Sequence, residues 1–342
     1  QLLIARIATR KAEKEWGNDF AELQQLLQTF SVSKSLQLSC GAENVSFIYQ
    51  QDGERPAHQL FERIEAEGGA DSVPLLSRLF YLTLSLQLGK NTTGGFSELL
   101  QLLREQRPYL ADAIGNSVYG YLLNHCIRQI NQGNEVFLQH THDLYNELLA
   151  KGALFIDGKL PPGQFKNMIA LGCRLQHLEW VEQFIVQYLP LLSDAHEGLA
   201  EQFNRAVLYF HQGKFAAAIE RFKHIIRQGT HDPFYGLDAR IYLWKSYFEH
   251  MDHLRPEDVD DMHRLYDSFR LYIDRNKKIS PLHRLQYRNF VRLFKRFVLI
   301  LETEHSPSYS SALSAFQTEL LSTQDVANKT WFAQKVAEAL LR

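Results

Sequence analysis

The sequence predicts an all-α protein, an α-solenoid in which antiparallel helical hairpins stack into a right-handed superhelix. Three observations lead to this prediction. Apolar residues recur at i, i+3, i+4 and i+7 in block after block, which is the period of a helix. The breaks between the blocks are short and contain Gly, Pro, Asn or Asp, as connections between antiparallel helices require. Part of the pattern also repeats after 34 residues, a spacing typical of stacked helical units.

Composition limits the class of protein. With 342 residues and 45% apolar content, the chain is too long for one compact globule, so it forms either several domains or an elongated array. The formal net charge of −2 gives no reason to expect non-specific binding to nucleic acid or to an anionic membrane. Apolar runs such as "FVLIL" at 297–301 are far shorter than the ~20 residues that a bilayer span needs. Three widely separated cysteines suit reduced thiols, so we expect a cytoplasmic protein that does not interact with a membrane.

The predicted organisation has three parts. Residues 1–160 are expected to form divergent helical hairpins, with breaks at 51–56, 67–74, 89–95, 107–108, 131–134 and 155–163. Residues 161–255 carry the repeated pattern, with breaks at 192–198, 228–233 and 253–256. Residues 256–342 are expected to form the C-terminal helices and a cap, with a break at 276–281.

The repeat is clearest at 203–228, "FNRAVLYFHQGKFAAAIERFKHIIRQ". The second half of this stretch has apolar residues at the positions that are also apolar 34 residues earlier, from Val181 to Leu192. We expect a turn at Gly213, and close helix packing at the small residues Ala206 and Ala218. His211, beside this turn, is interpreted as a solvated or capping residue at a helix end.

Spacing and residue type in this stretch resemble the tetratricopeptide repeat. The matching positions are Ala206, Tyr209, Gly213, Phe215, Ala218 and Phe222. Gln202 and Arg205 depart from the pattern, because the family prefers Trp and Leu there. The wider chain is similar to an uncharacterised group of bacterial repeat proteins. The resemblance implies an architecture and no particular activity.

Motifs for catalysis or metal binding are incomplete. "HEGLA" at 196–200 has Ala200 where a zinc-protease helix needs its second histidine. "GKNTTGG" at 89–95 has the residues of a phosphate loop in the wrong order, and "SVSK" at 31–34 lacks partner motifs. The histidines and acids between 249 and 263 fit no specific metal site. We therefore expect no enzyme activity, no metal and no cofactor.

Positive charge is concentrated between 264 and 296. This segment has ten Lys or Arg residues against two Asp, an excess of +8, so the rest of the chain carries −10. Four arginines at intervals of four residues predict a basic ridge along one helix face: Arg284, Arg288, Arg292 and Arg296. Such a ridge suits phosphate, nucleic acid or an acidic peptide. The competing interpretation is a solvated face that pairs with the acidic 249–261 segment.

The function predicted from these patterns is recognition. The concave surface of a helical stack suits an extended or helical peptide, so the chain is expected to act as a protein-interaction scaffold for an unidentified, acidic protein or peptide. Candidate contact residues in the repeats are Asn167, Arg174, Asn204 and Arg205. The alternative is a protein that binds nucleic acid or phosphate through the basic ridge, with a steep dependence of affinity on salt.

Overall fold

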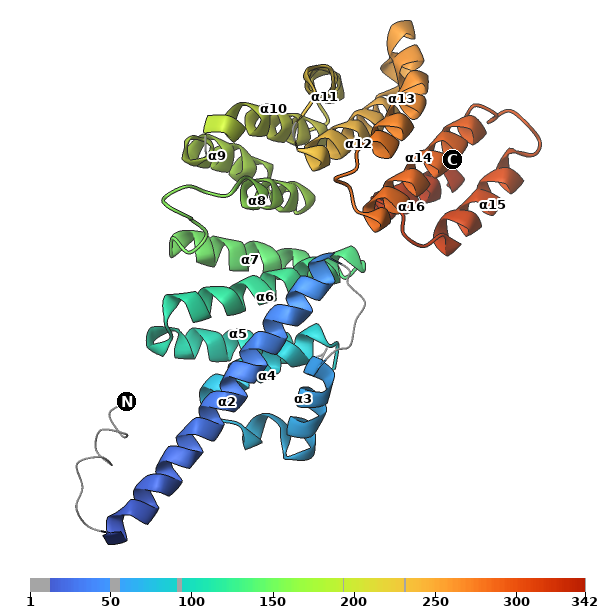
Figure 1. The fold of residues 1–342 in the computed structure, drawn as a ribbon. Helices are drawn as coiled ribbons and strands as arrows, with labels where there is room; N and C mark the ends of the chain where they lie inside the picture. Colours follow the sequence, from blue (N-terminus) through green and yellow to red (C-terminus); the bar gives the residue numbers. More distant parts are fainter. Residues whose placement is uncertain (1–12, 50–55, 91–93, 193, 231, 342) are drawn as a thin grey trace. The chain divides into compact units, whose positions relative to one another are not determined.

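The computed structural model of the chain describes the backbone of residues 13–49, 56–90, 94–192, 194–230 and 232–341 (Figure 1). These residues form 15 α-helices joined by short turns and contain no strand. One isolated β-bridge joins Ile156 to Lys159 within a turn. The predicted all-α class is therefore confirmed for the described part of the chain. None of its helices combines the length and the apolar character that a membrane span needs.

The chain divides into two compact units, Gln1–Leu144 and Tyr145–Arg342. The three-part organisation expected from the repeat pattern stays a prediction. The helices of the first unit are α2 (Glu13–Tyr49), α3 (Pro56–Ala66), α4 (Leu75–Gln87), α5 (Gly95–Gln106), α6 (Asp112–Asn131) and the first part of α7 (Val136–Ala150).

Helix α4 is the centre of the first unit. Its sequence, LLSRLFYLTLSLQ, is apolar on nearly every side, so most of its length is buried by its neighbours. Helix α2 packs along it, with the side chains of Leu36 and Cys40 fully buried. Two polar contacts join the helices: the hydroxyls of Ser33 and Ser77 lie 2.6 Å apart, and the Cys40 thiol donates to the Phe80 carbonyl.

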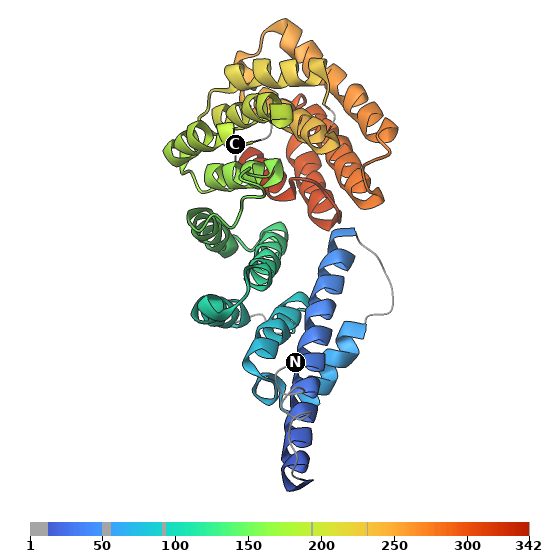
Figure 2. The ribbon, with the colours of Figure 1, turned by 60° about the vertical axis from the view of Figure 1, so that its left-hand side comes forward.

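The second unit is a succession of helices in which each packs against the next. The order of these helices can be followed by the sequence colours in Figure 2. Its helices after α7 are α8 (Pro162–Arg174), α9 (Leu178–Tyr188), α10 (Asp194–His211), α11 (Phe215–Gln228), α12 (Pro233–Glu249), α13 (Pro256–Arg275), α14 (Pro281–Leu301), α15 (Tyr309–Ser322) and α16 (Lys329–Leu340). Helices α8 and α9, α10 and α11, and α12 and α13 follow one another as hairpins. Their first helices also contact each other, α8 against α10 and α10 against α12.

Local sequence explains where these helices begin and end. Proline occupies the first turn of α8, α12, α13 and α14. The N–H groups of a first turn have no acceptor within the helix, so the missing N–H of proline costs no hydrogen bond there. Gly213 separates α10 from α11 at φ 72°, a conformation that side chains disfavour. Ala206 and Ala218 are both fully buried, as expected for positions of close helix packing.

The 34-residue register predicted for the first two hairpins is wrong. The turn from α8 to α9 has the same backbone hydrogen bonds as the turn from α10 to α11, with Gln176 at φ 60° in the place of Gly213. Helix α9 starts at Leu178 and α11 at Phe215, so equivalent turns lie 37 residues apart. The 3-10 turn at Leu189–Leu191 takes the place of the last turn of α11 in this alignment.

Candidate binding surface

The basic ridge lies on α14, and its arginines have partners. Arg288 pairs with Asp274 of α13, its Nε lying 3.0 Å from a carboxylate oxygen. Arg292 pairs with Glu319 of α15 at 2.7 Å, and Arg296 binds the second oxygen of the same carboxylate. About half of each of these three side chains stays exposed. The acids of two flanking helices therefore neutralise part of the ridge.

Arg284, the first residue of the ridge, is held by backbone instead. Its guanidinium donates to the carbonyls of Asn276 and Ile279 in the turn before α14. Among the described residues, no partner of the ridge belongs to the 249–261 segment, which the sequence had suggested as the counter-charge. A ligand of the ridge would have to compete with Asp274 and Glu319, because both acids are already engaged.

The four polar residues predicted in the repeats do not form one set. Asn204 is only 1% exposed and donates to the Ala200 carbonyl one turn back, so it belongs to the helix packing and not to a surface. Arg205 pairs along its own helix with Glu201 at 3.0 Å. Asn167 and Arg174 are exposed on α8. Only α8 therefore presents these candidates at an open surface.

The acidic segment at the start of α13 is used in ion pairs. The Lys223 amine of α11 lies 3.1 Å from Asp258 and 2.7 Å from Asp261. Hydrogen bonds from Lys223 and Arg264 hold the pKa of the Asp261 carboxyl below its usual value. The rings of His250 and His253 are 5.4 Å apart. Across the described residues no three His, Cys, Asp or Glu side chains gather as metal ligands would.

Two motifs from the sequence extend beyond the described residues. In "HEGLA" the side chains at 196 and 197 lie outside them, as do residues 91–93 of "GKNTTGG". The expectations about these motifs therefore stay predictions.

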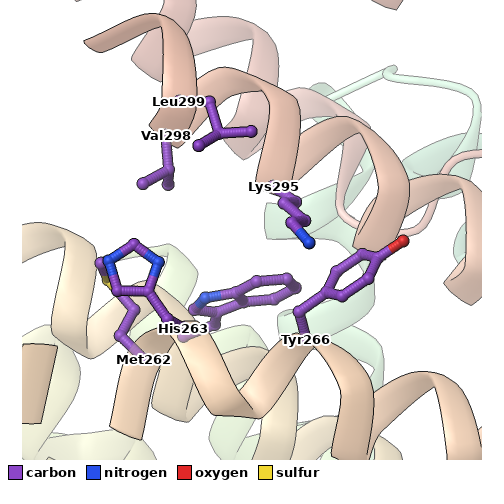
Figure 3. Close-up of a pocket in the computed structure, with 7 residues that line it drawn as sticks. Met262, His263, Tyr266, Lys295, Val298 and Leu299 are labelled. Carbon is purple, nitrogen blue, oxygen red and sulfur yellow. The ribbon is translucent and has the colours of Figure 1, made fainter. Parts of the chain in front are cut away.

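A hollow lies between α12, α13 and α14 (Figure 3). Figure 3 shows Lys295 reaching over the Tyr266 ring, with its amine 3.9 Å from the ring centre. Met262, Val298 and the buried Trp244 line the inner side. Its volume is about 20 Å³, room for about one water molecule, so it is too small for an organic ligand.

A patch of polar and aromatic side chains on α8, α10, α12, α14 and α16 was not predicted. At one end, the Lys166 amine of α8 pairs with Asp238 of α12 at 2.5 Å. The hydroxyl of Tyr287, on α14, donates to the same carboxylate at 2.9 Å. The Lys166 amine also lies 4.7 Å from the centre of the Tyr235 ring and 5.1 Å from that of Phe203. Helices α8, α12 and α14 are thus joined through the carboxylate of Asp238.

At the other end of the patch lies Lys245, which is 5% exposed. Its amine lies 4.7 to 5.1 Å from the centres of three rings, those of Phe210, Tyr242 and Trp331. Burial lowers the pKa of Lys245 to about 7, against the opposing attraction of Glu249. Glu249, one turn further along α12, is engaged by Lys335 of α16 at 3.0 Å and by the Trp331 indole N–H at 3.2 Å.

The interpretation of His211 as a solvated or capping residue is wrong. Its Nε2 atom is buried and has no hydrogen-bond partner among the described residues. The ring packs against Phe210 and Tyr242, with centres 5.2 and 6.3 Å apart. Burial, together with the nearby charges of Lys245 and Arg174, lowers the pKa of His211 to about 4. His211 is therefore neutral and sits in the same patch as Lys245.

One signal in the sequence could have indicated the patch. Lys245 occurs in "YLWKSYF", where every other residue except Ser246 is apolar or aromatic. The stem of a lysine in such a run is expected to lie against apolar neighbours. The partners on α8, α10 and α16 have no such signal because they come from distant segments.

No family model matches the chain, and no curated protein matches it.

Proposed function

We propose that this chain is a protein-interaction scaffold without catalytic activity of its own. In this proposal its helical hairpins stack as a right-handed α-solenoid similar to tetratricopeptide-repeat proteins. The first helices α8, α10 and α12 then form the surface that receives an extended or helical peptide. The partner is a protein or peptide with acidic groups, and the chain works in the cytoplasm.

One observation carries the proposal. Lys166 of α8, Asp238 of α12 and Tyr287 of α14 share a hydrogen-bonded network, although they come from three helices that are far apart in the sequence. These helices therefore present polar groups to a common side. A peptide could contact several helices at once on this side, which is how repeat proteins bind extended partners.

The thiols of the chain support the absence of catalysis. Burial raises the pKa of Cys126 and of Cys173 to about 12 and raises that of Cys40 further. A thiol so far from ionisation is a poor nucleophile and a poor metal ligand. The buried, unpaired state of all three cysteines also suits a reducing compartment.

Binding of nucleic acid or phosphate through the ridge of α14 is the competing proposal. It has less support, because Arg288, Arg292 and Arg296 already bind carboxylates. The half-exposed guanidinium groups could still attract phosphates by exchanging partners, and this would give an affinity that falls steeply with salt.

Partner capture with charge-reversal variants separates the two proposals. The bait is the full chain, nuclease-treated, as parent, Arg174→Glu, or the double variant Arg288→Glu with Arg292→Glu. Arg227→Glu is the matched control, because Arg227 is exposed on the second helix α11. The scaffold proposal expects a partner that is lost with Arg174→Glu and kept with the control and the ridge variant. Capture that is lost with the ridge variant, or that is seen only when the nuclease treatment is left out, would contradict it.

A further inference from the structure

The first half of helix α2 carries a stripe of apolar side chains that its own unit leaves open to solvent. No residue from 20 to 31 is buried, although five large apolar side chains lie in this stretch: Phe20, Leu23, Leu26, Leu27 and Phe30. Four of these are at least half exposed, from 52% for Leu26 to 60% for Phe30. Figure 1 shows that this end of α2 extends past α3 and α4. A contiguous stripe of this kind marks an interaction surface, whereas apolar residues exposed singly need no explanation.

The stripe has the spacing of a coiled-coil seam. Four of its residues follow one another at intervals of three, four and three, as the a and d positions of a heptad do. We call these four residues the α2 seam: Phe20, Leu23, Leu27 and Phe30. Leu36 and Cys40, which α2 buries against the first unit, lie about a third of a turn around the helix from the α2 seam. A second helix can therefore cover the α2 seam without displacing α4.

The same stretch of α2 carries little charge. Between residues 20 and 31, Glu22 is the one charged residue, and the other polar residues are Gln, Thr and Ser. A helix that faces only water normally has charged residues along its exposed side. The low charge also means that two copies of this stretch can approach each other with little electrostatic repulsion.

We propose that the α2 seam joins two copies of the chain as an antiparallel helix pair. With a two-fold axis beside residue 25, Phe20 of each copy contacts Phe30 of the other, and Leu23 contacts Leu27. Leu26 flanks the seam next to the axis, so Leu26 of one copy meets Leu26 of the other. Every apolar residue of the stripe thereby gains an apolar partner of its own size. This pairing does not depend on the proposed scaffold function.

The exposed apolar surface is large enough for such a pair. Each of the four side chains that are at least half exposed offers about 100 Å², so two copies together remove about 800 Å² of apolar surface from water. Leu23 and the flanking polar side chains add to this and bring the buried surface to the roughly 1,000 Å² at which specific interfaces begin. An interface of this size predicts a dimer that forms at micromolar concentrations.

Lys34 favours the antiparallel over the parallel arrangement. It occupies the heptad position that follows Phe30, four residues further along α2. In a parallel pair the two Lys34 side chains would lie opposite each other in the seam, where like charges repel. In the antiparallel pair they lie at opposite ends, about 27 Å apart along the helix axis.

Sedimentation equilibrium of the full chain tests the pair. Between about 1 and 100 µM the apparent mass is expected to rise from 39.7 kDa towards twice that value. The double variant Leu27→Glu with Phe30→Glu introduces charge into the seam and should weaken the dimer at least about 100-fold. Leu38→Glu is the matched control: Leu38 is 73% exposed on the same helix but lies beyond the seam, so this variant should dimerise as the parent does.

Chemical cross-linking tests the orientation. The native thiols are buried, so a short bismaleimide joins only introduced cysteines. Leu26→Cys should be cross-linked into a dimer, because the antiparallel pair brings the two positions together, and Lys34→Cys should not. Circular dichroism confirms that each variant is folded before it is measured.

Three results would overturn the proposal. The first is a parent protein with the mass of one chain over the whole concentration range, which would mean that another segment or another protein covers the α2 seam. The second is equal dimerisation of the parent and of Leu27→Glu with Phe30→Glu. The third is cross-linking of Lys34→Cys in place of Leu26→Cys.

Discussion

Replacing Lys245 by methionine is expected to stabilise the protein near neutral pH, which is unusual for a change at a buried position. The folded state lowers the pKa of this amine from 10.5 to about 7, chiefly through burial. That difference corresponds to about 5 kcal/mol of unfavourable free energy for the charged form. Contacts of the amine with the faces of Phe210, Tyr242 and Trp331 offset part of this unfavourable free energy, by about 0.5–2 kcal/mol for each favourable contact. A net gain of about 2 kcal/mol or more is expected for Lys245→Met at pH 6.5.

The pH dependence identifies the cause of this gain. Between pH 7 and pH 10.5 the unfolded chain binds more protons at Lys245 than the folded chain does, so the stability of the parent rises with pH through this range. The difference between Lys245→Met and the parent should therefore shrink at pH 10. Urea unfolding of both proteins at pH 6.5 and pH 10, followed by circular dichroism, measures it. A variant that is less stable than the parent at pH 6.5, or a difference that does not change with pH, would refute the reasoning.

Three further predictions concern packing, acid and thiols. Ala218→Trp should cost about 1–3 kcal/mol or more, since Ala218 is fully buried between helices; an unchanged melting temperature would contradict this packing. Acid should destabilise the first unit as pH falls from 6.5 towards 4, because burial lowers the pKa of His125 to about 4 and the unfolded chain binds the proton first. His125→Phe should remove about 3 kcal/mol of this loss, and equal acid sensitivity in both proteins would show another cause. The thiols of Cys40, Cys126 and Cys173 are all buried, so they should react with a disulfide reagent only after unfolding. Rapid reaction of the native protein would contradict this prediction.

Helix positions were predictable because they depend on local chemistry. A glycine at Gly213 and a proline at Pro281 mark helix ends wherever the rest of the chain lies, and both boundaries agree with the structure. The spacing between hairpins was not predictable from apolar positions alone. Apolar residues continue through the 3-10 turn at Leu189–Leu191, so a shift of three residues still places apolar side chains opposite one another.

Candidate surface residues were harder to predict, because their state depends on distant helices. The spacing of Arg288, Arg292 and Arg296 places them on one exposed side of α14. Their acidic partners could not be foreseen, since Asp274 and Glu319 lie on different helices. His211 is indeed the last residue of α10, but it is not solvated as expected. The partial burial of its ring results from contacts with residues such as Tyr242, which lies 31 residues further along the chain.

The central claim, that α8, α10 and α12 receive a protein partner, is tested most directly by hydrogen–deuterium exchange of the chain with and without its captured partner. Bound peptide excludes water and slows local opening of the helices it covers. The account predicts that the partner slows exchange in these three helices, while α15 exchanges as before. Protection confined to α13, α14 and α15, around the basic ridge, would contradict it.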